Sequence, residues 1–136
     1  MNEDWVRNND RSRFIKSKII KDYFASWVKR DFTQVPKCFS PEIFYREWYG
    51  ATYQGLHELI VWLAASLLKQ TALEWRIDDS EITNKNKFVV TWFFHAKDEK
   101  EYAFDGVSLI EFKGNKIIRV SEYSAKHELT RPYRSR

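Results

Sequence analysis

The sequence has little of several features that would divide it or crosslink it. Its 136 residues include a single cysteine, Cys38, so no disulfide can form within the chain, which is typical of proteins in a reducing compartment. Only four glycines and three prolines occur, and no linker, repeat or low-complexity segment interrupts the chain. We therefore predict a single domain over residues 1–136, with residues 1–9 and 127–136 peripheral to it.

Neither a charge of one sign nor a long apolar run dominates the chain. Its 23 Lys and Arg residues are interleaved with 19 Asp and Glu residues, and the net charge is +4. A nucleic-acid-binding domain usually carries a basic stripe, and a membrane helix needs roughly 18 consecutive apolar residues. Neither pattern is present, and the first residues do not resemble a signal peptide. We expect a cytoplasmic protein with neither a nucleic acid nor a membrane as its partner.

Metal and phosphate sites also lack their usual sequence signatures. The three histidines, Cys38 and the carboxylates do not follow a metal-ligand spacing. There is no glycine-rich phosphate loop and no nucleophile elbow. We therefore expect no metal and no cofactor.

Aromatic residues, in contrast, are abundant. Six Trp, seven Tyr and ten Phe make up 17% of the chain. Aromatic rings bury large areas at low entropic cost, and they also line most small-molecule pockets. Composition alone favours a core built from rings, and a cavity lined by rings is the alternative.

Hydrophobic periodicity predicts the order of the elements. Apolar residues recur at helical spacing in two segments, and the period changes to two in the second half of the chain. The expected elements are helices over about residues 10–31 and 55–67, a helical turn over 33–39, a loop over 49–53, and strands over 43–48, 73–78, 87–96, 102–112 and 116–125.

This order predicts an α+β fold. Helices come first and most strands later, which argues against alternating βαβ units. The strand over 87–96 is apolar on both faces, so we expect it to be central and covered on both sides. The last three strands are joined by short turns and should form an antiparallel meander. The predicted architecture is a cone-shaped, curved antiparallel sheet wrapped around helices, with an interior suited to a ligand.

Three local patterns resemble one known family. They are Tyr23-Phe24-Ala25-Ser26-Trp27 at the end of the first helix, Tyr53-Gln54-Gly55 before the second, and Phe104-Asp105-Gly106 with Gly114-Asn115-Lys116-Ile117 in the last hairpin. Together, over residues 10–126, they resemble the SnoaL-like branch of the nuclear transport factor 2-like superfamily, which has a cystatin-like α+β roll. The resemblance implies a homodimer formed through the outer face of the sheet. It also implies cofactor-independent isomerase, cyclase or dehydratase chemistry, although some members only bind partners.

The sequence departs from the family at two catalytic positions. The final strand of the cyclases and epoxide hydrolases carries an aspartate two residues after an aromatic residue, and Ala125 stands there after Tyr123. The matching part of the middle strand reads Trp92-Phe93-Phe94, without the Arg-x-Asp pair of the epoxide hydrolases. Both departures count against those two mechanisms.

Three carboxylates are candidates for a site inside the cone. A buried carboxylate has a raised pKa and can exchange a proton near neutral pH. Strict alternation points Ile118, Val120 and Glu122 inward. It points Asp105 outward unless Gly106 forms a bulge, and it leaves the direction of Glu47 undecided. Glu122 and Asp105 are our catalytic candidates.

Aromatic and polar side chains on the same faces are the candidates for binding a ligand. They are Tyr23, Trp27, Tyr45, Trp48, Tyr53, Trp62, Trp92, Phe94, Phe104 and Ser108. Three hypotheses follow: a domain that binds a flat apolar, aromatic or polycyclic small molecule; an acid/base enzyme that uses a cavity carboxylate; and a protein-interaction module whose cavity is filled by its own rings.

Overall fold

The computed structural model describes the backbone of residues 3–135 and the side chains of residues 10–135. Its elements in chain order are α1 (Glu3–Lys29), the 3-10 turn η1 (Val35–Lys37), β1 (Phe39–Arg46), β2 (Thr52–Gln54), α2 (Leu56–Lys69), β3 (Thr71–Ile82), β4 (Phe88–Lys97), β5 (Glu101–Lys113) and β6 (Lys116–Ala125). The α+β class is confirmed. Within the described part of the chain, neither helix has the length and hydropathy needed to cross a membrane.

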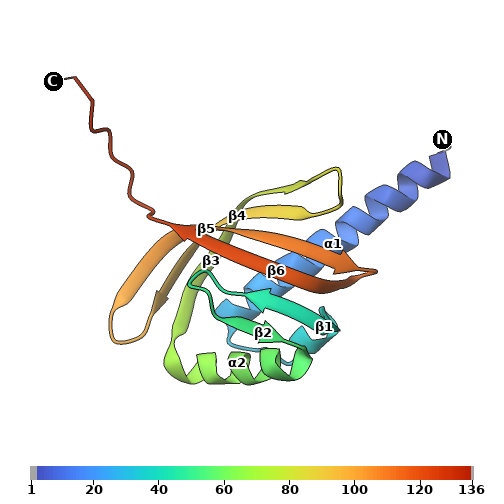
Figure 1. Cartoon of the computed structure of the whole chain (residues 1–136), viewed down its shortest axis with the longest axis horizontal. Coiled ribbons are helices and arrows are strands. Elements are labelled where there is room, and N and C mark those ends of the chain that lie inside the picture. Colours follow the sequence, from blue (N-terminus) through green and yellow to red (C-terminus); the bar gives the residue numbers. More distant parts are fainter. Residues whose placement is uncertain (1–2, 136) are drawn as a thin grey trace.

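The six strands form one curved sheet in the order β2-β1-β6-β5-β4-β3 (Figure 1). Strands β4 to β6 form the predicted antiparallel meander, and β3 extends it by pairing antiparallel with β4. Strand β1 pairs antiparallel with β2 but parallel with β6, so the sheet is mixed rather than wholly antiparallel. Parallel neighbours need a long crossover connection. Here β2, α2 and the meander supply that connection.

Helix α1 lies behind the sheet in the view of Figure 1, and α2 lies at one end of the sheet. The apolar stripe of α1 is buried, with Ile20, Tyr23 and Phe24 each 2% exposed. This burial follows from the helical spacing of these residues, because one face of the helix can then pack on the sheet. The concave side of the sheet therefore contains the core.

Several predicted boundaries were wrong: β1 begins at Phe39 rather than at Ile43, and β3 ends at Ile82 rather than at Asp78. Helix α1 begins at Glu3 rather than near Asp10, and its first turns extend beyond the sheet. Trp5 and Val6 are the only apolar residues in the segment 3–9 and do not recur at helical spacing, so hydrophobic periodicity did not detect these turns. The predicted loop over 49–53 contains the start of β2, which is only three residues long and pairs with β1.

Two strands also differ in burial from what the sequence predicted. In β3 the pairing with β4 shifts between Ala72 and Glu74, so Ala72 is buried and Leu73 is exposed. Strand β4 is central, as predicted, and its inward side chains are buried. Its outward side chains Val89 and Phe93 are only half-buried, so the expectation of cover on both faces was wrong for a single chain.

Candidate functional site

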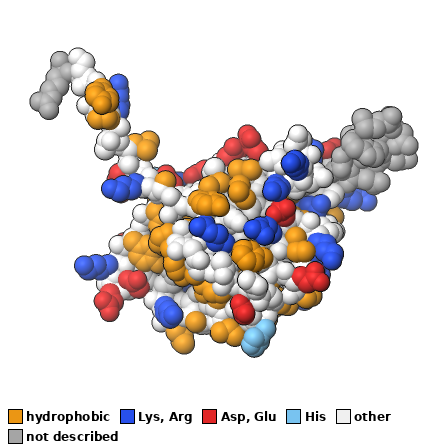
Figure 2. All heavy atoms as spheres, viewed as in Figure 1, with side chains coloured by type: hydrophobic (Ala, Val, Ile, Leu, Met, Phe, Trp, Pro, Cys, Tyr) orange, Lys and Arg blue, Asp and Glu red, His pale blue; other side chains and the backbone are white. Residues whose placement is uncertain are grey.

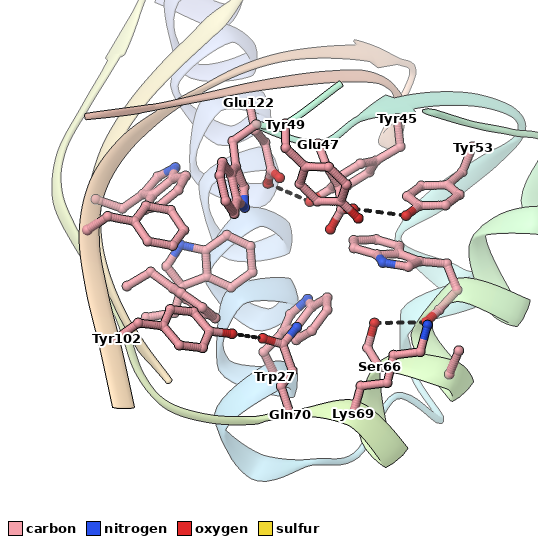
Figure 3. A pocket seen from close by; sticks show the side chains of 17 residues that line it. Trp27, Tyr45, Glu47, Tyr49, Tyr53, Ser66, Lys69, Gln70, Tyr102 and Glu122 are labelled. Carbon is pink, nitrogen blue, oxygen red and sulfur yellow. Dashed lines mark hydrogen bonds between the residues drawn. The ribbon is translucent and has the colours of Figure 1, made fainter. Parts of the chain in front are cut away.

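A cavity of about 230 Å³ lies between the concave face of the sheet and the two helices (Figure 3). Most of the predicted ligand-binding residues line it. These are Trp27, Tyr45, Trp48, Tyr53, Trp62, Trp92, Phe94 and Phe104. The rings come from α1, α2, the sheet and the turn after β1, so segments far apart in the chain meet around one volume.

Two predicted ligand-binding residues lie behind this wall instead. The side chain of Tyr23 is 2% exposed, and its hydroxyl donates a hydrogen bond to the Tyr45 hydroxyl at 2.8 Å. Ser108 is 0% exposed, and its hydroxyl oxygen accepts a hydrogen bond from Nε1 of Trp92 at 2.9 Å. Both residues hold a lining ring in place, and neither lines the cavity itself.

The position of Trp92 depends on a glycine in the neighbouring strand. Gly106 pairs with Trp92, and a Cβ atom built on Gly106 would lie 2.2 Å from the Trp92 ring. The absence of a side chain therefore lets the indole lie flat over β5. No register shift occurs at Gly106, so the bulge considered from the sequence does not form.

Glu122 is the most deeply buried acid of the site. It is 4% exposed on β6, and its Oε2 accepts a hydrogen bond from the Tyr45 hydroxyl at 2.6 Å. With the bond from Tyr23 to Tyr45, this makes a relay of two hydroxyls that ends on the carboxylate. The pKa of Glu122 is raised to about 8, mainly by burial; the hydrogen bond from Tyr45 offsets part of this rise, and the charge of the nearby Glu47 carboxylate adds to it.

Tyr23 and Tyr45 are held in their neutral, hydrogen-bonding form. Burial raises the pKa of both phenols well above the ordinary value, and the Glu122 charge adds to this effect. Both hydroxyls can therefore donate protons in hydrogen bonds at any physiological pH. Glu122 is the group of this relay that can change its charge near neutral pH.

Glu47, whose direction the sequence left undecided, also lines the cavity. It is 7% exposed and directly follows β1, and its Oε2 accepts a hydrogen bond from the Tyr53 hydroxyl at 2.9 Å. The turn that begins there is closed by a bond from the Gly50 amide to the Glu47 carbonyl, with Gly50 at a φ of 100°. Burial raises the pKa of Glu47, and the neighbouring Tyr49 and Tyr53 hydroxyls offset only part of the effect.

Figure 3 places the two carboxylates at one end of the cavity and a second polar group at the other. At that far end the Tyr102 hydroxyl donates a hydrogen bond to the side-chain oxygen of Gln70. Lys69 from the end of α2 also lines the cavity, and its charge partly lowers the pKa of Glu47. Among residues 10–135, no ion pair reaches either carboxylate.

Several lining residues were not proposed from the sequence. They are Tyr49, Ala65, Ser66, Lys69, Gln70, Trp75 and Tyr102. Trp75 and Tyr102 lie on strands that were correctly predicted, so alternation could have nominated them. The residues from the end of α2 lie beside the cavity only because of the way that α2 packs against the rest of the domain. Hydrophobic periodicity predicts a helix but not its position relative to other elements.

Asp105, the second catalytic candidate, lies outside the cavity. Alternation without a bulge points it to the outer face of β5, where its carboxylate lies 2.8 Å from Nδ1 of His127. It is therefore not brought together with Glu122. Within the described residues, no group of three or more His, Cys, Asp or Glu side chains could hold a metal ion.

Two indole N–H groups of the lining have no protein partner. Nε1 of Trp27 and Nε1 of Trp75 are buried, and among the described residues neither donates a hydrogen bond. Buried donors of this kind are uncommon because each costs free energy when left unpaired. Both tryptophans line the cavity, so its wall contains buried donors as well as carboxylates.

Comparison with solved structures supports the fold. The chain superposes on a candidate isomerase from Bacillus subtilis with a TM-score of 0.76 and 10% identity, covering 84% of this chain and 88% of the other. It also resembles a protein with a ketosteroid isomerase-like fold from Catenulispora acidiphila in complex with trimethylamine, with a TM-score of 0.69, 15% identity and coverage of 77% and 83%. A candidate SnoaL-like polyketide cyclase from Shewanella denitrificans superposes with a TM-score of 0.68 and 17% identity, covering 82% of this chain and 90% of the other.

Sequence comparison identifies the family. No curated protein matches the chain significantly. The profile of the SnoaL-like domain, however, matches residues 20–120, which span the end of α1, the cavity lining except Glu122, and most of the sheet. With the matching fold and the motifs at the ends of α1 and β5, this shows that the chain belongs to the SnoaL-like domain family.

Proposed function

We propose that the domain binds a small molecule with an apolar body of about one or two rings and one polar group. The observation that carries the proposal is a cavity of about 230 Å³ with aromatic walls and a deeply buried carboxylate. An engineered apolar cavity of roughly 150 Å³ holds benzene, and drug-sized ligands occupy pockets above about 300 Å³. The intermediate volume favours a ligand smaller than the polycyclic compounds considered from the sequence.

Two further observations support binding over a purely structural role. A core filled by its own rings would leave no volume of this size, and it would not leave buried indole N–H groups unpaired at the same place. The related fold from Catenulispora acidiphila is in complex with trimethylamine, so a ligand of a few heavy atoms is compatible with this architecture.

The test uses one pair of substitutions on α2. Ala65 lines the cavity, and its neighbour Ala64 is exposed. Ala65→Phe should fill part of the cavity, whereas Ala64→Phe adds the same ring to the surface. We expect a panel of one-ring and two-ring compounds to change the tryptophan fluorescence of the wild type and of Ala64→Phe, and to bind Ala65→Phe at least about tenfold more weakly. Equal binding by both variants, or no binding by the wild type, would contradict the proposal.

Acid/base catalysis is a second candidate, favoured by the pKa of Glu122 near 8 and by the hydroxyl relay behind it. Near neutral pH such a carboxyl group can both accept and donate a proton. Its protonated form, or the Tyr45 hydroxyl, could stabilise an oxyanion that develops on a carbonyl substrate. The reaction class would be proton transfer next to a carbonyl, as in an isomerase, cyclase or dehydratase.

Proton transfer of this kind is measured by deuterium exchange. A one-ring or two-ring ketone in D₂O should exchange the hydrogen next to its carbonyl, with a rate that changes near pH 8. Glu122→Gln should abolish the exchange, and Asp105→Asn, on the outer face, should not affect it. Binding without any exchange above the uncatalysed rate would leave the domain a binding protein and reject this candidate.

We also propose a homodimer formed through the outer face of the sheet, which Figure 2 shows as orange hydrophobic groups between blue Lys and Arg side chains. Phe93 is half-buried there, and Leu109 and Tyr123 are exposed. A face of this composition is suited to an interface. Light scattering should give a mass near twice 16.4 kDa, and a mass of 16.4 kDa at micromolar concentration would reject the proposal.

A further inference from the structure

The rings of the cavity do not form a parallel slot for a flat ligand. Tyr53 and Trp62 stack on each other at 4.5 Å between ring centroids with 14° between planes, so both occupy the same wall. Other rings meet at steep angles, such as Trp27 to Trp62 at 56° and Trp48 to Phe104 at 52°. A wall of rings in several orientations surrounds a compact, rounded group better than a planar one.

Such a wall has an electrostatic preference. The face of an aromatic ring carries the negative end of its quadrupole, so several rings around one volume attract a cation whose hydration shell has been removed. Rings from α1, α2, five strands and the turn after β1 contribute, as Figure 3 shows for Trp27, Tyr49, Tyr53 and Tyr102. Neutral apolar ligands gain nothing from this field.

The acidic end of the cavity has the same preference. Glu122 and Glu47 are 4% and 7% exposed, and the hydroxyls of Tyr45 and Tyr53 donate one hydrogen bond to each. Among the described residues no cation is paired with either carboxylate. Burial makes the charged form of both acids costly, which is why the pKa of each is raised, and a bound cation would offset that cost. An anionic ligand would increase it.

We propose that the ligand is an organic cation with a compact ammonium group, bound among the aromatic rings with its charge facing Glu47 and Glu122. This inference rests on the proposed function, because it names the chemical class of the molecule that the cavity binds. A quaternary or tertiary methylated ammonium group fits best. It has at most one N–H group that needs a hydrogen-bond acceptor, and it presents methyl groups to the rings.

Cation binding should be linked to proton release. The titratable groups that interact with Glu122 are Tyr23 of α1, Tyr45 of β1 and Glu47 directly after it. The other titratable groups that line the cavity are Tyr49 of the following turn, Tyr53 of β2, Lys69 of α2 and Tyr102 of β5. Burial gives Glu122 a pKa of about 8, so near pH 7 it must lose its proton when the cation enters. Affinity should therefore rise with pH up to about 8 and then level off. A neutral ligand that accepts a hydrogen bond from protonated Glu122 should show the opposite dependence.

The experiment compares a cation with its uncharged carbon isostere. Choline and 3,3-dimethylbutan-1-ol have nearly the same shape and differ by one positive charge. Tetramethylammonium and phenyltrimethylammonium extend the series to smaller and larger cations. Titration calorimetry at pH 6, 7 and 8.5 in two buffers of different ionisation enthalpy gives the affinities and the protons released. Glu122→Gln and Glu47→Gln remove the charges, and Glu101→Gln, at the exposed start of β5 beside the turn from β4, is the matched control.

We expect at least one cation to bind about tenfold or more tightly than the isostere, as cation–π and charge interactions in a dry site require. Glu122→Gln and Glu47→Gln should remove most of that difference, and Glu101→Gln should preserve it. Equal or tighter binding of the isostere would overturn the inference and leave the proposed function intact. The same holds if only the neutral compounds of the Ala65 experiment bind. If nothing binds, both proposals fail.

Discussion

The two ends of the concave face differ in chemistry, although the same strands build both. One end, which we call the closed end, is filled by core side chains. Strand β1 contributes Phe39 and Ile43 there, and β6 contributes Ile117, all of them at most 1% exposed. At the cavity end the same two strands lead to Tyr45 and Glu122. Hydrophobic burial therefore stabilises one end, while the other end keeps polar groups that contribute little to stability.

The difference between the closed end and the cavity end indicates where stability and function can vary independently. Side chains at the closed end are buried in the hydrophobic core, so their loss creates a cavity and costs free energy of unfolding. At the cavity end the space already exists. Substitutions there should alter binding and pH dependence more than the free energy of unfolding.

The largest expected effect on stability is that of Phe39→Ala at the closed end. Phe39 is 0% exposed and packs edge-on against Tyr23 at 5.1 Å. Removing the ring should lower the free energy of unfolding by about 3–5 kcal/mol. Trp48→Ala at the cavity end removes a larger side chain that is 42% exposed, and should cost only about 1 kcal/mol. Urea denaturation measures the free energy of unfolding of both variants. Equal decreases would contradict the difference between the two ends.

The second effect is a pH dependence caused by Glu122. Its pKa rises from 4.5 to about 8 on folding, so the folded state binds more protons between these values. Stability contributed by the protonated group is complete below pH 4.5 and is lost as the pH rises through about 8. The loss is on the order of a few kcal/mol. Glu122→Gln should flatten this slope in urea melts from pH 5 to 9, whereas Glu101→Gln should not alter it.

A smaller effect is expected where the cavity wall meets the sheet. The Cβ atom of Gly106→Ala would collide with the Trp92 ring, which packs against Trp75 and Phe104. The indole must then move, and its hydrogen bond to Ser108 is lost. We expect a destabilisation of about 1–3 kcal/mol together with weaker ligand binding. A crystal structure of the variant with an unmoved indole would contradict this explanation of the glycine.

Much of the fold and part of the site could be predicted from the sequence. Periodicity found α2 and the meander because those segments pack one regular face on the core. Alternation identified Glu122, since β6 continues without a register shift from Val120 to the cavity. The register shift near Glu111 nevertheless buries Ile117 and leaves Ile118, expected inward, only half-buried.

The rest of the site depends on features that no local pattern reports. Glu47 lies where β1 ends in a turn, so alternation along the strand could not decide its direction. Lys69 and Gln70 reach the cavity only through the docking of α2. Tyr23 and Ser108 were assigned to the wall because they share its faces, but larger rings stand between them and the cavity.

The smallest effect is expected on the outer face of the sheet, from Asp105→Asn. Asp105 pairs with His127 at 2.8 Å, and the two side chains are 40% and 49% exposed. Exposed pairs contribute between about 0 and 1 kcal/mol because water and salt screen them. Stability should change by no more than about 0.5 kcal/mol, and the affinity for a cavity ligand should stay the same. Asp105 lies one residue from Gly106, on the opposite face from Trp92. A loss of affinity as large as that of Glu122→Gln would therefore mean that the outer face controls the cavity through the strand between them.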